Sequence, residues 1–180
     1  MPRRLIALVV LFVPLAIALD RWLALRRGSR PPLALSMLEV VDAPIEETWA
    51  VLSDIPRQPE WMRDMKRVAI TTPGPVGVGT RGEATVRILG VGVSDPVEVT
   101  EFEPPVRFAV RHDGLFTGDG VLTLEPGADG TTTIVRWTET LIPPVLPEIG
   151  ALAQAPILRS VFQADLHRLK RLVEMDATGR

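Results

Sequence analysis

The sequence contains no cysteine and only two histidines, His112 and His167, among its 180 residues. The absence of cysteine excludes disulfides, thiolate metal sites and cysteine nucleophiles. Two histidines are too few for a histidine-rich metal site. The chain also lacks a nucleophile motif and a glycine-rich phosphate-binding loop. We therefore expect neither a metal nor a cofactor.

An excess of charge of one sign is also missing. The chain has 20 lysines and arginines against 22 aspartates and glutamates, which gives a formal net charge of -2. Because the two signs are interspersed, there is no broad basic field that could bind a phosphate backbone. Nucleic acid is therefore not an expected partner.

Near the N-terminus, residues 5–19 form a long uncharged and apolar run. Spanning a bilayer takes roughly 20 residues, so this run is long enough only if residues 22–25 are added. Asp20 and Arg21 would then lie near an interface, where long side chains can reach water. We expect residues 1–27 to form a single-pass membrane anchor, so that a membrane is one partner of the chain.

Two other interpretations of this segment stay open. A secretory signal peptide has an apolar region of about 7 to 15 residues and a small-residue cleavage site. Ala16 and Ala18 provide such an Ala-x-Ala pattern. The segment could also be an apolar helix that packs on the domain. Cleavage would give a secreted or periplasmic protein.

The orientation of the anchor follows from its flanking arginines. Four of them lie after the uncharged run and two lie before it, and the positive-inside rule then puts the folded domain on the cytoplasmic side. They are Arg21, Arg26, Arg27 and Arg30 after the run, and Arg3 and Arg4 before it.

The composition changes at residues 28–33, which contain glycine, serine, arginine and two prolines. Such a stretch is typical of a linker. We expect one globular domain at residues 34–176 and a short tail at residues 177–180, since 180 residues suffice for one domain and an appendage.

The domain begins with a leucine- and valine-rich segment at residues 34–41, which predicts a strand. Asp42 as a cap and Pro44 in the first turn then predict a helix, which ends near Asp54. A second short helix is predicted at residues 60–64.

Six further segments alternate or are bounded by turn residues, and we expect them to be strands. Asp95 and Pro96 interrupt the third of them, which indicates a bulge or an edge. The six segments are residues 65–72, 81–89, 91–102, 106–113, 116–125 and 131–141.

Residues 157–175 have apolar side chains on one helical face and charged ones on the other, which predicts an amphipathic helix. Asp165 alone breaks the apolar face. So wide an apolar stripe needs a large apolar partner, and the strands can supply it. The sequence therefore predicts an α+β fold in which a curved antiparallel sheet of about seven strands surrounds a long C-terminal helix.

Four stretches of this chain resemble the START-like helix-grip superfamily, often abbreviated SRPBCC. They are VDAPIEETWAVLSDIPRQPEW at residues 41–61, VTEFEPPVRFAVR at 99–111, GTTTIVRWTETL at 130–141 and LHRLKRLVE at 166–174. The nearest subgroup is the polyketide cyclase/dehydrase and lipid-transport group, and the N-terminal segment is an addition to it. The resemblance implies a helix-grip fold with two short helices after the first strand.

The resemblance also implies a cavity between sheet and helix that holds a lipid, polyketide, sterol or quinone, so a hydrophobic small molecule or lipid is the expected partner. The alternative is that the same side chains meet and fill a dry core. The candidate cavity residues from the strands are Val86, Ile88, Val93, Phe108, Val110, Leu122, Leu124, Val135 and Trp137, with Trp61, Phe116, Leu158 and Phe162 at the mouth or lid.

Three titratable residues are expected to point into this space: His112, Glu139 and Asp165. Burial raises the pKa of a carboxyl group, and imidazole exchanges protons near neutral pH, so the three could catalyse aldol cyclisation or dehydration. Structural alternatives stay open: His112 could lie at an exposed strand end, Glu139 could pair with an arginine, and Asp165 could bind a backbone amide or an arginine such as Arg63. His167 lies on the polar helix face and is expected to be solvated.

Three functions fit these observations. The first is a membrane-anchored protein that binds or transfers a hydrophobic small molecule or lipid. The second is a cyclase or dehydratase that acts on a polyketide-like substrate. The third is an interaction scaffold without a ligand.

Overall fold

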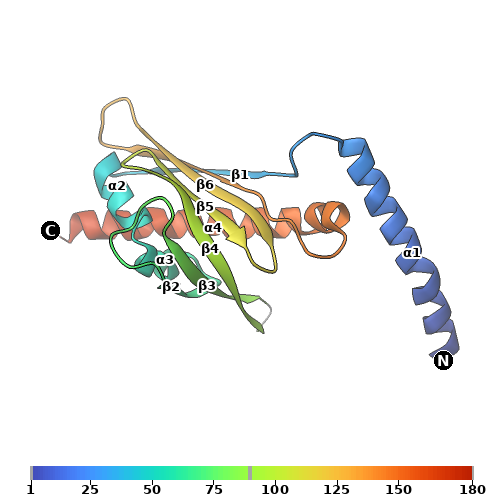
Figure 1. Ribbon diagram of the computed structural model, residues 1–180. Helices are drawn as coiled ribbons and strands as arrows, with labels where there is room; N and C mark the ends of the chain where they lie inside the picture. The colour runs from blue at the N-terminus through green and yellow to red at the C-terminus, as the bar shows by residue number, and fades with distance from the viewer. Residues whose placement is uncertain (1, 89–90, 180) are drawn as a thin grey trace.

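The structure is a computed structural model that describes residues 2–88 and 91–179, with side chains for residues 12–87 and 92–179. An antiparallel sheet of seven strands and a long C-terminal helix, α4 (Pro147–Thr178), form the domain. This confirms the predicted α+β class and the helix-grip arrangement. Figure 1 shows α4 along one face of the sheet, with α2 and α3 near one of its ends and α1 near the other.

The strands follow the order β1-β7-β6-β5-β4-β3-β2 across the sheet. The first and last strands of the chain are therefore neighbours, with Leu35 opposite Glu139. The strand bounds are β1 (Leu35–Val41), β2 (Met65–Ile70), β3 (Arg81–Ile88), β4 (Val91–Glu103), β5 (Arg107–Asp113), β6 (Thr117–Pro126) and β7 (Thr133–Glu139).

The interruption at Asp95 and Pro96 is a local edge. Both residues pair with β3, whereas the pairing of β4 with β5 begins only at Val97. A proline is tolerated there because no second strand needs its missing N–H. The shift in register lies further along β4, between Val99 and Glu101.

Short helices follow β1: α2 (Ile45–Leu52), the 3-10 helix η1 (Ile55–Arg57) and α3 (Gln58–Trp61). The prediction that Asp42 caps the first of them is wrong. Pro44 occupies the cap position without a side-chain hydrogen bond, and the Asp42 carboxylate instead accepts a hydrogen bond from Nζ of Lys170 at 2.8 Å. A charged partner on α4 thus competes successfully with the amides of α2 for this carboxylate.

Helix α4 begins ten residues earlier than predicted, at Pro147 instead of residue 157. Pro156, which lies directly before the predicted start, lacks an N–H, and a proline normally ends or bends a helix. Here the helix continues through Pro156, on a stretch where both Pro156 and Leu152 are exposed. Water can therefore hydrate the backbone carbonyl that Pro156 leaves without a donor.

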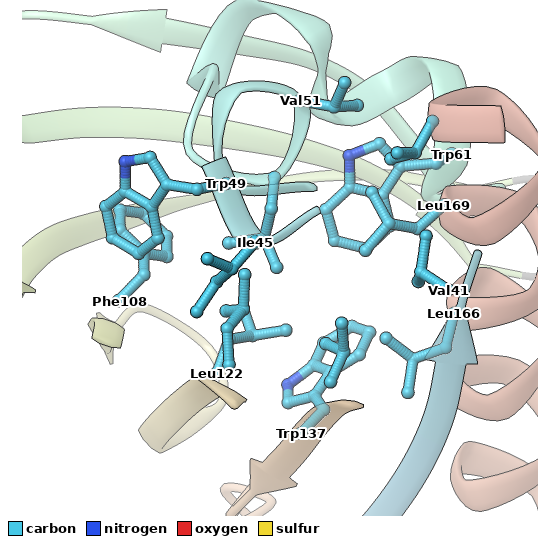
Figure 2. Close-up of a cluster of buried hydrophobic side chains, with 14 of the residues drawn as sticks. Val41, Ile45, Trp49, Val51, Trp61, Phe108, Leu122, Trp137, Leu166 and Leu169 are labelled. Atoms are coloured by element: carbon cyan, nitrogen blue, oxygen red, sulfur yellow. The ribbon is translucent and has the colours of Figure 1, made fainter. Parts of the chain in front are cut away.

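The core lies between the sheet and the second half of α4. Leu166, Leu169 and Val173 are buried there against strand residues such as Leu124 and Val135. Figure 2 shows Leu166 and Leu169 beside residues from the strands and from the short helices. Burying each such aliphatic side chain contributes about 1.5–3 kcal/mol, so this half of α4 is an integral part of the domain.

Helix α4 also covers the outer edge of β1. Nε2 of Gln163 donates to the carbonyl oxygen of Leu38 at 2.9 Å, and Nζ of Lys170 donates to that of Val40 at 2.9 Å. These long side chains satisfy carbonyl groups that an edge strand otherwise leaves to water.

The N-terminal segment forms a helix, α1 (Pro2–Arg27), which projects from the domain in Figure 1. Side chains of residues 1–11, which belong to the expected anchor, lie outside the described part. Within the described part of the chain, no helix has the length and apolar character needed to cross a bilayer.

Candidate functional site

A buried carboxylate, that of Glu139, lies in the interior at the end of β7. Only 3% of Glu139 is exposed. Its Oε2 accepts a hydrogen bond from Nε1 of Trp137 at 2.8 Å, and its Oε1 lies 3.0 Å from Nε2 of His112. A carboxylate removed from water needs such partners because its desolvation is costly. The three residues therefore form one polar unit within an otherwise apolar interior.

Two glycines of β6 lie between the strands that carry His112 and Glu139, and Gly120 leaves the space that the Glu139 carboxylate occupies. His112 on β5 pairs with Gly118, and Glu139 on β7 pairs with Gly120. A Cβ atom on Gly120 would lie 2.5 Å from Oε2 of Glu139, and one on Gly118 would overlap the carbonyl oxygen of Thr140. The sequence analysis did not single out these glycines, although a glycine inside a strand is a signal of close approach.

Nε2 of His112 and Oε1 of Glu139 form a buried pair 3.0 Å apart, although its alignment is not that of a regular hydrogen bond. Burial disfavours the charged imidazole, but the nearby Glu139 carboxylate outweighs this effect, so the pKa of His112 lies above its ordinary value of 6.5. The pair can therefore offer both a donor and an acceptor to a third group.

A further polar group without a partner lies on the same side of the sheet. Trp61, at the end of α3, is fully buried, and its Nε1 has no hydrogen-bond partner within the described part of the chain. Its ring centre lies 6.0 Å from that of Trp137, at an edge-to-face angle of 75°. In Figure 2, Trp61 and Trp137 extend from α3 and β7 toward the same region of the interior.

Phe162 of α4 closes this aromatic group from the helix side, with its ring centre 4.8 Å from that of Trp137. Aromatic contacts at such distances add to the stability of a core. They also occupy the middle of the space between sheet and helix. A ligand that enters there has to displace Phe162 or approach from beside it.

The structure places the predicted cavity residues with described side chains in two environments, half-buried and buried. Ile88 belongs to β3, but its side chain lies outside the described part. The half-buried ones are Val86, Val93, Val110, Phe116, Leu158 and Phe162, of which Val110, Leu158 and Phe162 pack against the buried core. The buried ones are Trp61, Phe108, Leu122, Leu124, Val135 and Trp137.

Asp165 does not join His112 and Glu139, so the prediction of three converging groups is wrong. Its Oδ1 accepts hydrogen bonds from the backbone N–H of Arg63 at 3.1 Å and from Nη1 of Arg168 at 2.6 Å. Burial raises the pKa of Asp165, and these two donors oppose that effect. Asp165 thus joins α4 to the segment after α3, which is the structural alternative that the sequence left open.

The second histidine lies far from this chemistry. His167 is exposed, and its Nδ1 contacts the Glu39 carboxylate of β1. Among the described residues, no group of carboxylates and imidazoles gathers closely enough to hold a metal ion.

An apolar crevice lies between the first half of α4 and the sheet. Its cavity volume is about 10 Å³, which is roughly the space that one water molecule needs. Leu35, which lines it, is the pairing partner of Glu139, so the crevice adjoins the buried carboxylate. Its lining residues are Leu33, Leu35, Leu141, Ala151, Gln154 and Leu158, of which Leu158 was predicted.

A second hollow is wider and more open, and it lies on the surface near the other end of α4. Charged residues such as Glu60, Arg168 and Arg171 contribute to its lining. It contains none of the predicted cavity residues.

Comparison of the sequence with protein families gives one match. Residues 35–174 match the family described as polyketide cyclase / dehydrase and lipid transport. The matched range includes His112, Glu139 and all seven strands of the sheet. A search of curated proteins gives no match.

Comparison with solved structures shows the same fold in proteins of low sequence identity. A protein from Deinococcus radiodurans is 24% identical, with a TM-score of 0.60 over 82% of this chain and 99% of that one. The Zhui aromatase/cyclase from Streptomyces sp. R1128 is 17% identical, with a TM-score of 0.65 over 81% and 95%. A START superfamily protein from Mycobacterium smegmatis is 16% identical, with a TM-score of 0.62 over 79% and 97%.

Proposed function

Because the chain belongs to the polyketide cyclase / dehydrase and lipid transport family, we propose that its domain, residues 34–176, binds a hydrophobic small molecule or lipid between the sheet and α4. The ligand is largely apolar and carries one polar group that contains oxygen. The observation that carries this proposal is the buried N–H of Trp61, which has no partner among the described residues, in an apolar interior that also holds the His112–Glu139 pair.

Unpartnered polar atoms in a core normally destabilise a protein by about 1–3 kcal/mol each. A ligand can remove this penalty by bonding to them. The N–H of Trp61 can donate to a carbonyl or hydroxyl oxygen, and Oε1 of Glu139 can accept from a hydroxyl group. Apolar walls with a few convergent polar groups are typical of small-molecule sites. The aromatic rings of Trp137 and Phe162 would contact the apolar part of the ligand.

Native mass spectrometry of the detergent-purified full chain tests this proposal first. We expect a co-purifying apolar molecule, and an empty protein that also fails to bind an apolar dye such as anilinonaphthalene sulfonate would support the ligand-free scaffold instead. The dye then serves for comparing variants.

The matched pair Trp61→Phe and Trp49→Phe sharpens the test. Each variant removes one indole N–H, but Trp49 packs against Phe102, in another part of the core from the Trp61–Trp137 pair. Loss of one hydrogen bond of about 1 kcal/mol predicts a roughly fivefold weaker affinity for the co-purified ligand in Trp61→Phe. Equal affinities of the two variants would contradict the role of Trp61.

A second function, cyclisation or dehydration of a polyketide-like substrate, is favoured by one specific observation. His112 and Glu139 place an imidazole and a carboxylate 3.0 Å apart in a buried site. His112 could remove a proton from the carbon next to a ketone, and Glu139 could stabilise the imidazolium that forms. In this proposal Asp165 has no role, because Arg63 and Arg168 occupy its oxygen.

Turnover of a short poly-β-keto thioester, followed by the absorbance of an aromatic product, tests this second function. General acid–base catalysis typically contributes about 10²–10⁴-fold to the rate, so we expect a loss of that size in His112→Gln and in Glu139→Gln. Unchanged turnover in both variants, or no turnover in the wild type, would exclude it.

We also propose that α1 attaches the domain to a membrane, with the domain on the cytoplasmic side. In support, Phe12, Leu15 and Leu19 are exposed on the described part of α1, and exposed apolar surface of this kind favours contact with lipid. Arg26, which lies over the Trp22 ring at 4.3 Å, belongs to the arginines that follow this surface.

Membrane fractionation and protease protection in intact cells test the attachment. We expect the chain in the membrane pellet and a domain that is protected from external protease. A mature N-terminus at residue 19 in the purified protein, as cleavage after Ala18 would leave, would favour a cleaved signal peptide and a secreted or periplasmic domain instead.

A further inference from the structure

The first turn of α4 is capped by a residue that lies 128 positions earlier in the chain. Its own cap residue, Leu146, has a left-handed backbone with φ of 50° and offers no side-chain acceptor. Instead, Oδ1 of Asp20 accepts hydrogen bonds from the backbone N–H groups of Glu148 and Ile149, both at 2.9 Å. Aspartate is among the best residues for this role, although it normally directly precedes the helix.

A second contact joins the same two helices. Nε of Arg27 donates to Oε1 of Glu148 at 2.9 Å, in a partly buried ion pair. Asp20 itself is 6% exposed. Among the described side chains of α1, those of Asp20 and Arg27 therefore both contact the first turn of α4.

The first half of α4 is attached to the sheet much more weakly than the second half. Within the described residues of α4, those that are fully buried begin only at Asp165. Among the described residues of α4 before Pro156, one side-chain hydrogen bond reaches the sheet side, from Nε2 of Gln154 to the carbonyl oxygen of Leu141 at 2.8 Å. Pro156 interrupts the hydrogen bonds between the two halves, which allows a bend at this position.

This first half lines the apolar crevice through Ala151, Gln154 and Leu158. The opposite wall contains Leu35, whose pairing partner is Glu139. A displacement of residues 147–158 away from the sheet would therefore open a path from solvent to the buried carboxylate.

We infer that Asp20 and Arg27 form a latch that holds the first half of α4 closed over this path. When α1 moves away from the domain, Glu148 and Ile149 lose their acceptor and Glu148 loses its ion pair. Residues 147–158 then become mobile, with Pro156 as the bend. The site would thus open in response to the position of α1. Only the part of this inference that concerns ligand entry rests on the proposed function.

The absence of cysteine allows a direct test by site-directed spin labelling. Leu152 and Met175 are exposed positions in the first and second halves of α4, so Leu152→Cys and Met175→Cys can each carry a nitroxide. We expect Asp20→Ala to increase the label mobility at position 152 and to leave position 175 unchanged. Equal mobility with and without Asp20→Ala at position 152 would overturn the latch.

Hydrogen exchange of the unlabelled full chain gives a second measurement. Asp20→Ala is expected to raise the exchange rates of amides in residues 148–158 about tenfold or more, because local opening controls exchange. Asp20→Asn keeps an acceptor oxygen and should largely retain the wild-type rates. Asp42→Ala is the matched control, since Asp42 contacts α4 through Lys170 in the second half. An increase spread evenly over α4 and the strands would contradict the inference.

The rate of dye entry separates this inference from the proposed function. If the dye binds, Asp20→Ala should speed its entry severalfold at an almost unchanged final affinity. If the wild type binds no dye while the label at position 152 still responds to Asp20→Ala, the latch holds and the proposed function fails. A label that does not respond, in a protein that binds dye normally, overturns the latch alone.

Discussion

In the second half of α4, Leu166, Leu169 and Val173 are buried against the sheet, whereas in the first half Leu152 and Ile157 are 56% and 68% exposed. One continuous helix therefore combines a part that is buried against the sheet with a part that lines the crevice beside Leu35. The first half of such a helix can move locally without unfolding the domain, because apolar burial stabilises mainly the second half.

The largest expected effect concerns the buried half. Leu169→Ala should lower the free energy of unfolding by about 2–5 kcal/mol, since it leaves a cavity in the core. Ile157→Ala, a truncation in the exposed half, should change it by no more than about 0.5 kcal/mol. Urea unfolding followed by tryptophan fluorescence measures both values. Similar losses in the two variants would show that the two halves are equally integral to the fold.

Asp165 is the first fully buried residue among the described residues of α4, and its removal should have a smaller effect. Asp165→Ala leaves the backbone N–H of Arg63 without an acceptor, so we expect a loss of about 1–3 kcal/mol in the free energy of unfolding. Asp165→Asn retains an acceptor oxygen and should lose less. If both substitutions cost the same, the charge of Asp165 matters more than the hydrogen bond to Arg63.

The pH dependence of the unfolding free energy tests the raised pKa of His112, which lies beside Glu139. The folded chain holds the His112 proton more tightly than the unfolded chain, so this contribution is full below the unfolded pKa near 6.5. It is lost as the pH rises through the higher folded pKa. The difference in unfolding free energy between the wild type and His112→Gln should therefore decrease with rising pH. A difference that grows with pH would contradict the assigned direction.

The smallest effect on the free energy of unfolding is expected from the surface ion pairs near the C-terminal end of α4. Arg57 forms ion pairs with Glu60 at 2.9 Å and with Asp176 of α4 at 3.0 Å. Because these pairs are exposed to solvent, Arg57→Gln should lower the free energy of unfolding by about 0–1 kcal/mol. A loss as large as that of Leu169→Ala would mean that charge, and not apolar burial, holds the end of α4.

Much of the fold follows from local patterns in the sequence. Alternating strands and an apolar helix stripe were sufficient to predict a sheet around a C-terminal helix, because both patterns record which side chains are buried. The start of α4 was missed because the prediction rested on the apolar face of residues 157–175, and the described residues of α4 before Pro156 contribute no fully buried side chain. Asp42 was misassigned because its partner, Lys170, lies far away in the sequence.

The site was predictable only in part for the same reason. His112 and Glu139 were both identified by the faces of their strands, but their contact depends on the register of three strands and on Gly118 and Gly120. Asp165 shares a helix face with core residues, yet it points to Arg63. Contacts between distant segments of this kind cannot be deduced from the periodicity of one segment.

The side chains of Gln163 and Lys170, which bond to the carbonyl groups of Leu38 and Val40, have a consequence for association between molecules. An exposed edge strand invites a strand from another chain to pair with it, and this leads to aggregation. In this protein an incoming strand would first have to break two bonds that α4 makes with β1. Helix α4 therefore protects the sheet from strand addition along β1, even when many copies are crowded together.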